Sequence, residues 1–252
     1  MKQYFITDQG KVREHNEDAG GIFRNRENQV LSVVADGMGG HNAGDVASKM
    51  VINYFQKGWP ETTSFKTKEE TEEWLTNSIN EINQKVYDHA QKNTECTGMG
   101  TTIVAAIFTG DFVSIAHIGD SRCYLYHDHI LRQVTDDHSL VNELVRSGQI
   151  SKEDAAFHPR KNVLMRALGT DESAFPDVRS EEWKENDRLL ICSDGLSNKV
   201  SDEEFGAYLE KSDSVELIGQ QLVNLANERG GEDNITITLS EYESVKEGDP
   251  SC

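Results

Sequence analysis

The sequence feature that most constrains the fold is a short apolar run that ends in Asp-Gly and occurs twice. Residues 31–37 read LSVVADG, and residues 189–195 read LLICSDG. Each run is typical of a buried strand, so Asp36 and Asp194 are expected where strands end. An Asp-Gly after a strand is ordinarily a hairpin turn, but neither pair leads into a matching return strand. The repetition favours a role for both acids beyond a turn.

Segments rich in β-branched and aromatic residues predict strands at both ends of the chain. Helical periodicity falls in two blocks between the strands, where apolar residues recur every three or four positions. The strongest such stripe, Leu75 to Val86, is interpreted as core-facing rather than as a cofactor site. Strands are expected at residues 4–7, 19–24, 29–35, 101–108, 112–118, 122–127, 130–134, 188–192 and 235–242, and helices at 43–56, 67–93 and 215–227.

The order of these segments predicts the fold class. Strands and helices do not alternate strictly, so antiparallel sheets covered by helices fit better than a doubly wound parallel sheet. We therefore predict a layered α+β sandwich. No Pro-, Gly- or Ser-rich linker divides the chain, which favours one domain over residues 1–242, followed by a disordered acidic tail at 243–252. A looser pattern between residues 136 and 177 predicts a partly mobile insertion.

Charge and hydropathy exclude several kinds of partner. The 44 acidic residues outnumber the 25 Lys and Arg residues and give a net charge of −19, which argues against nucleic acid or an anionic membrane as a partner. The longest apolar run, residues 103–108, is far shorter than the roughly 18 residues of a membrane span. The first 16 residues have no apolar core, so no secretory signal is expected. These features favour a cytoplasmic protein.

Three further acids, Asp18, Asp120 and Asp233, also stand at strand boundaries. Any single one would ordinarily be a solvated surface charge. If all five acids converged at one sheet edge, they would repel each other by several kcal/mol unless a cation compensated them. The cysteines form no C-x-x-C pair, so a hard cation held by oxygen is expected, and the glycines at 39 and 40 would let backbone carbonyls approach it. Two divalent ions roughly 3.5 to 4 Å apart would generate a hydroxide able to attack phosphorus.

A series of short motifs resembles, in its order, that of metal-dependent protein phosphatases of type 2C. Each motif alone is weak, but the ordered set is specific, and the resemblance extends from about residue 4 to residue 242. The motifs are RxxNED at 13–18, ADGMGGH at 35–41, GTT at 100–102, GDSR at 119–122, DH at 137–138, SDG at 193–195 and GEDN at 231–234.

This resemblance implies a four-layer αββα sandwich, with two central antiparallel sheets flanked by helices and a flap insertion at about residues 142–171. It implies hydrolysis of phosphoserine and phosphothreonine in proteins by a metal-bridging hydroxide, without a phosphoenzyme. Two tightly bound Mn²⁺ or Mg²⁺ ions and a weaker third are implied as cofactors. The size of the chain resembles stand-alone bacterial members that oppose a Ser/Thr kinase, so phosphoproteins including such a kinase are expected partners of a monomer.

The resemblance also implies the metal ligands. Asp36 corresponds to the acid that bridges two metals, and Gly37 to the residue that gives its carbonyl to one of them. Asp194 and Asp233 resemble ligands of the second metal. Asp120 resembles the acid of the weaker third site, which Asp194 would share.

Four other residues receive roles in the same way. Asp18 resembles an acid that acts through metal-bound waters, and Asn234 one that orients its neighbour. Arg13 resembles the phosphate-binding arginine, whose planar guanidinium can hold two oxygens. His41 resembles the histidine that protonates the leaving oxygen. Without the motifs, Arg13 and His41 would be interpreted as surface residues.

The Asp137-His138 motif is interpreted as architectural, capping a helix over residues 139–146. Two other functions stay open. One is a phosphatase of anti-anti-sigma factors, although such relatives usually carry added regulatory domains. The other is a catalytically inactive pseudophosphatase that only binds phosphoproteins. Loss of a metal ligand would mark that second class, and Asp36, Asp194 and Asp233 are intact.

Overall fold

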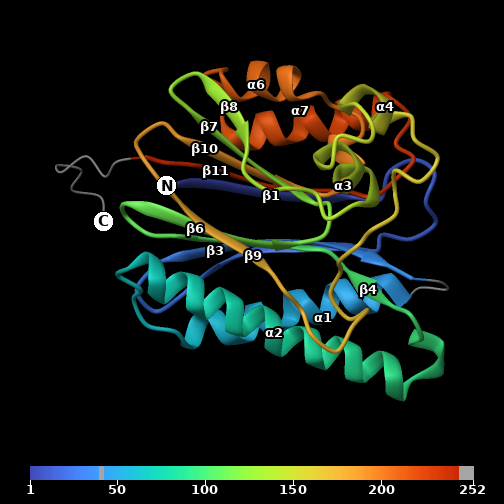
Figure 1. The fold of residues 1–252 in the computed structure, drawn as a ribbon. Coiled ribbons are helices and arrows are strands. Elements are labelled where there is room, and N and C mark those ends of the chain that lie inside the picture. Colours follow the sequence, from blue (N-terminus) through green and yellow to red (C-terminus); the bar gives the residue numbers. More distant parts are fainter. Residues whose placement is uncertain (40–42, 244–252) are drawn as a thin grey trace.

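The computed structural model describes residues 1–39 and 43–243, and its strands lie at both ends of that range (Figure 1). The strands are β1 (Lys2–Asp8), β2 (Asp18–Arg24), β3 (Val30–Met38), β4 (Gly100–Thr101), β5 (Ile103–Phe108), β6 (Phe112–Ile118), β7 (Arg122–His127), β8 (Ile130–Gln133), β9 (Asp177–Glu182), β10 (Arg188–Cys192) and β11 (Ile235–Glu241).

The helices form two groups, one before β4 and one after β8. They are α1 (Ala43–Gly58), α2 (Lys68–Lys92), α3 (Leu140–Arg146), α4 (Lys152–Ala156), α5 (Asp194–Ser197), α6 (Asp202–Leu209) and α7 (Val215–Glu228), with short 3₁₀ helices η1 (Trp59–Glu61) and η2 (Thr94–Cys96). Within the described residues, none of these helices is both long and apolar enough to cross a membrane.

Two antiparallel sheets lie face to face at the centre, and helices cover the outer face of each (Figure 1). One sheet has the order β1-β11-β10-β7-β8, and the other has the order β2-β3-β5-β6-β9, with β4 paired to β3. Helices α1 and α2 pack on the second sheet, whereas α6 and α7 pack on the first. The predicted α+β sandwich of four layers is confirmed.

Alternation along the strands builds this layering. In β5, the side chains of Ile103, Ala105 and Ile107 face α1 and α2, and the intervening side chains face the other sheet. A strand buried on both faces reads as a continuous apolar run, as residues 103–108 do. The stripe from Leu75 to Val86 is buried against the sheet, so the core-facing interpretation of that stripe is confirmed.

Several short elements were not predicted, among them β9, α5 and α6, and one prediction was too long. Strand β9 was missed because four of its six residues are charged; it lies at a sheet edge, where charged side chains reach solvent. Helix α6 is only eight residues long, with Phe205 and Leu209 buried. The expected strand at 101–108 is split at Thr102, whose hydroxyl accepts a hydrogen bond from the backbone N–H of Asp36.

Candidate active site

Five aspartates converge at one end of the sandwich. Asp18 and Asp36 are direct register partners at the start of β2 and towards the end of β3. Asp194 follows β10 and begins α5, Asp233 comes two residues before β11, and Asp120 lies in the turn from β6 to β7. The charges of the other four all act on Asp36. The structure therefore brings together the acids that the sequence singled out.

Asp18, Asp36, Asp120 and Asp194 all have pKa values raised above the ordinary range. Burial raises the pKa of Asp36 well above its ordinary value, and the four neighbouring carboxylates raise it further. Burial likewise raises the pKa of Asp18 and of Asp120 to about 7 each, with nearby Asp194 contributing in both cases. Like charges in a desolvated site favour protons or a bound cation. The oxygen-only donor set suits a hard divalent cation such as Mn²⁺ or Mg²⁺.

Gly37 fits between the cluster and the beginning of α1. A Cβ on Gly37 would lie 2.1 Å from the carbonyl oxygen of Gly44, so no side chain can be accommodated. The backbone N–H of Gly37 donates to the carbonyl of Glu17 at 3.2 Å, and that carbonyl also accepts from the Ser48 hydroxyl at 2.6 Å. These contacts join β3, α1 and the loop before β2 at the acid cluster.

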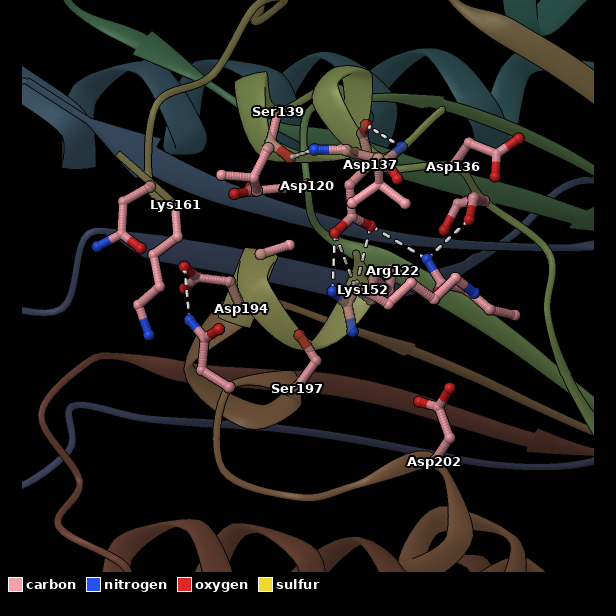
Figure 2. A pocket seen from close by; sticks show the side chains of 18 of the residues that line it. Asp120, Arg122, Asp136, Asp137, Ser139, Lys152, Lys161, Asp194, Ser197 and Asp202 are labelled. Carbon is pink, nitrogen blue, oxygen red and sulfur yellow. Dashed lines mark hydrogen bonds and ion pairs between the residues drawn. The ribbon is translucent and has the colours of Figure 1, made fainter. Parts of the chain in front are cut away.

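Arg13 stands at the mouth of the cluster. Its Nη2 donates to Oδ2 of Asp233 at 2.8 Å, and its side chain is about half exposed, at 48%. The guanidinium is therefore anchored to one acid and remains accessible to an anion from solvent. Arg122, by contrast, is held by Asp137 through bonds of 3.0 Å from Nε and 2.8 Å from Nη2, so it is engaged within the fold (Figure 2).

Asn234 ties the loop that carries Arg13 to the last strand. Its Nδ2 donates to the carbonyls of Gln9 at 2.8 Å and His15 at 3.0 Å, and its Oδ1 accepts from the backbone N–H of Glu17 at 2.8 Å. Its own N–H donates to Oδ1 of Asp233 at 2.9 Å. One amide thus fixes both sides of the cluster, which agrees with an orienting role.

Several side chains that hold the acids were not singled out by the sequence. Ser193 donates to Oδ2 of Asp18 at 2.7 Å, and Asn198 donates to Oδ2 of Asp194 at 3.0 Å. Asn198 lies four residues after Asp194, a spacing that places two side chains on one helix face and was a usable signal. The contact of Ser193 with Asp18 joins residues 175 positions apart, so no local pattern indicates it.

Glu17 also belongs to this region. Burial raises its pKa, while the positive charge of Arg13 acts in the opposite direction. It lies in the same motif as Asp18 but received no role from the sequence. His41, the expected proton donor, lies outside the described residues, as does the acidic tail from residue 244 onward.

A cavity of about 730 Å³ opens beside Asp120 and Asp194 (Figure 2). Its other walls come from the segment that carries α3 and α4, which contributes Lys152 and Lys161, and from the start of α6 at Asp202. The expected flap therefore lines a space next to the acids that is large enough for peptide side chains.

Comparison with known proteins identifies relatives along almost the whole chain. The family model described as "Protein phosphatase 2C" matches residues 9–239. The serine/threonine phosphatase stp of Listeria monocytogenes is 48% identical over 248 residues, which covers 98% of each chain. The structure of Stp1 from Staphylococcus aureus aligns with a TM-score of 0.92 at 42% identity, covering 96% of this chain and 95% of that one. The catalytic domain of the phosphatase PstP, solved with two manganese ions, aligns with a TM-score of 0.84 at 34% identity, covering 95% and 97%.

Proposed function

The chain belongs to the protein phosphatase 2C family, and from that membership we propose how its residues divide the work of hydrolysis. The protein is a metal-dependent protein-serine/threonine phosphatase. The observation that carries the assignment of roles is the convergence of five aspartates at one end of the sandwich, where burial raises the pKa of Asp18, Asp36, Asp120 and Asp194.

The acids form the metal centre. In this proposal two divalent cations, Mn²⁺ or Mg²⁺, are bound tightly and a third is bound weakly. When bound, such cations compensate the acid cluster and lower the pKa of a water so that it can attack phosphorus. The residues that hold them are Asp36, the carbonyl of Gly37, Asp194 and Asp233 for the tight sites, Asp120 with Asp194 for the weak site, and Asp18 through water.

Arg13 holds the phosphate group of the substrate. Its position at the mouth of the cluster and its exposed guanidinium support this role, because two parallel N–H donors match two phosphate oxygens. Its bond to Asp233 keeps the guanidinium next to the reacting group. Asn234 acts through these neighbours by fixing the loop of residues 9–17.

His41 protonates the departing serine or threonine oxygen. It follows Asp36 by five residues, and imidazole can donate a proton to a poor leaving group near neutral pH. Replacing His41 with alanine should therefore slow phosphothreonine hydrolysis but spare p-nitrophenyl phosphate, whose leaving group needs no proton. Equal losses on both substrates would contradict this role.

The wider setting is also part of the proposal. Residues 1–242 form one phosphatase domain with a flap at about 142–171, which works as a cytoplasmic monomer on phosphoproteins and opposes a Ser/Thr kinase. Similarity to the serine/threonine phosphatase stp of Listeria monocytogenes over 98% of both chains supports the action on phosphoproteins. The pseudophosphatase alternative is disfavoured because all five acids are present and converge.

Phosphate release from a phosphothreonine peptide tests the function directly. Metal-stripped protein should be inactive, added Mn²⁺ should restore turnover, and EDTA should abolish it again. A folded protein that binds the phosphopeptide without releasing phosphate at any Mn²⁺ concentration would be a binding protein and not an enzyme.

A further inference from the structure

A second group of ionisable side chains, two buried histidines and one exposed aspartate, lies close to Asp120. His117 at the end of β6, His138 before α3 and Asp177 at the start of β9 bring three potential ligand atoms within 4.8 Å of one another. The two imidazole rings are stacked, with centroids 4.5 Å apart and an interplanar angle of 23°. Two histidines and a carboxylate have the composition of a transition-metal site.

The hydrogen bonds of this group favour a different role. Nδ1 of His138 accepts from the backbone N–H of Gly119 at 3.1 Å, so the neutral ring carries its proton on Nε2, which lies 3.3 Å from Oδ2 of Asp177. A metal ligand would need the Nε2 lone pair, which that proton occupies. Arg166 already neutralises Asp177 through bonds of 2.9 and 3.3 Å. The group is therefore a closed hydrogen-bond network.

His138 holds the backbone directly before Asp120 from two sides. Its Nδ1 accepts the N–H of Gly119, and its own backbone N–H donates to the Gly119 carbonyl at 2.9 Å. Gly119 has a φ of +110°, and a Cβ there would lie 2.5 Å from the Thr102 side chain, so the position requires glycine. Burial lowers the pKa of His138 to about 4, which keeps the accepting lone pair available at neutral pH.

The same histidine reaches the end of the flap. The carbonyl of His138 accepts from the N–H of Met165 at 2.7 Å, and the next residue, Arg166, bonds the Asp177 carboxylate that faces Nε2. One residue thus contacts the turn that presents Asp120, the end of the flap and the edge strand β9.

We propose that His138 is a positioning residue that sets the Asp120 carboxylate for the weak metal site by holding Gly119 through Nδ1. This inference rests on the proposed function, because it assumes that Asp120 holds a metal there. It assigns separate tasks to the two ring nitrogens: Nδ1 serves the metal site, and Nε2 serves the edge of the flap.

Two substitutions separate the two nitrogens. In His138→Asn, the amide oxygen can take the place of Nδ1, whereas in His138→Gln the terminal amide can take the place of Nε2 only. Manganese binding to metal-stripped, full-length protein is measured by calorimetry and by the electron paramagnetic resonance of free Mn²⁺. His138→Gln should weaken the weakest site by about 10-fold or more and leave the tight sites unchanged. His138→Asn should stay within about 2-fold of wild type.

Controls make each outcome decisive. Asp120→Asn should lose the weak site alone, and Asp177→Asn, which leaves Nδ1 untouched, should keep it. The inference is overturned if His138→Asn or Asp177→Asn loses the weak site, if a folded His138→Gln keeps it, or if the wild type binds only two ions. If His138→Gln fails to fold, loss of the weak site in His138→Asn or Asp177→Asn still overturns the inference. Failure of the proposed function is a separate observation, since wild type would then bind Mn²⁺ without releasing phosphate.

Discussion

Two groups of ionisable residues lie near Gly119, and their electrostatics are opposite. In the acid cluster, burial and like charges raise the pKa of Asp18 to about 7. In the His138 network, partial burial acts in the same direction, but hydrogen bonds from Arg166 and His138 prevail and lower the pKa of Asp177 to about 2. In the first group only Asp233 is paired with a cation, Arg13, and the other four acids have no cation in contact within the described residues, whereas in the second group Arg166 pairs with Asp177.

The difference shows which group is built for stability and which for function. A fold that maximised stability would pair each carboxylate with a cation, as Arg166 pairs with Asp177. The acid cluster instead keeps unfavourable repulsion that an external cation can relieve. Cation binding then stabilises the folded state in proportion to its affinity.

The largest expected effect that tests the difference between the two groups is the loss of turnover when one acid of the cluster is replaced. Asp36→Asn or Asp194→Asn should lower kcat by about 10³-fold or more, because several kcal/mol of charge stabilisation is lost with a metal ligand. Without metal, each variant should melt no lower than metal-free wild type, since removing one acid relieves repulsion. Turnover with Mn²⁺ and calorimetry in EDTA are the measurements.

The matched control for that experiment is Asp177→Asn in the compensated network. It should keep its turnover but lose about 1 kcal/mol or less, which is a fall in melting temperature of about 2–4 °C at most. If Asp36→Asn lowered the metal-free melting temperature as Asp177→Asn does, the acids would be structural and the contrast between the two groups would disappear.

The next effect is the pH dependence of metal-free stability. A carboxyl group whose pKa is raised on folding stabilises the fold below its unfolded value of 3.8, and that stabilisation is lost as pH rises through about 7. Each of Asp18 and Asp120 should contribute a loss of about 4 kcal/mol between pH 4 and 8. Asp177 acts in the opposite sense, because its contribution is lost only as pH falls from 3.8 through about 2.

Scanning calorimetry in EDTA from pH 5 to pH 8 checks this dependence. The difference between wild type and Asp18→Asn isolates one carboxyl group, and it should grow in favour of the variant as pH rises. Saturating Mn²⁺ should reduce the difference. A difference independent of pH would mean that Asp18 titrates as an ordinary surface acid.

A smaller effect distinguishes the two arginines. Arg13→Ala should cost about 1.5–3 kcal/mol in kcat/KM, mainly through KM, because a charged hydrogen bond to phosphate is removed. Arg166→Ala, which removes the partner of Asp177, should lower the melting temperature and leave KM for p-nitrophenyl phosphate unchanged. Unchanged kinetics in Arg13→Ala would remove Arg13 from the phosphate site.

The sequence predicted the layered fold and the position of the acids because both depend on local patterns along the strands. Apolar alternation fixes which face of β5 is buried, and a strand that ends in Asp-Gly places its carboxylate at the sheet edge. Strand β9 escaped because an edge strand does not need an apolar pattern. The contacts of Ser193 with Asp18 and of His138 with Gly119 escaped because they join segments distant in sequence. Motif order could indicate His138 but not the task of each nitrogen.

The smallest expected effect concerns the flap, whose cations lie next to the acid cluster and can contact the substrate. Lys161 lines the cavity beside Asp194, and Arg160 precedes it; both are exposed, and no ion pair holds either within residues 1–39 and 43–243. Two unpaired cations next to an acidic site can attract an acidic segment that flanks the phosphorylated residue. Exposed charge pairs contribute about 0.2–1 kcal/mol each, so replacing both with alanine should lower kcat/KM for an acidic phosphopeptide by about 2- to 30-fold.

A basic phosphopeptide and p-nitrophenyl phosphate provide the comparison, because neither gains from these cations, and both should be hydrolysed at nearly the wild-type rate. The matched variant is the double replacement of Lys85 and Lys92 on α2, which also removes two positive charges but lies on the opposite side of the sandwich (Figure 1). A loss confined to the acidic peptide and to the flap variant would identify the flap as an electrostatic selector. If the α2 variant showed the same loss, the effect would come from net charge alone. A uniform loss on all three substrates would mean that Arg160 and Lys161 affect catalysis and not substrate selectivity.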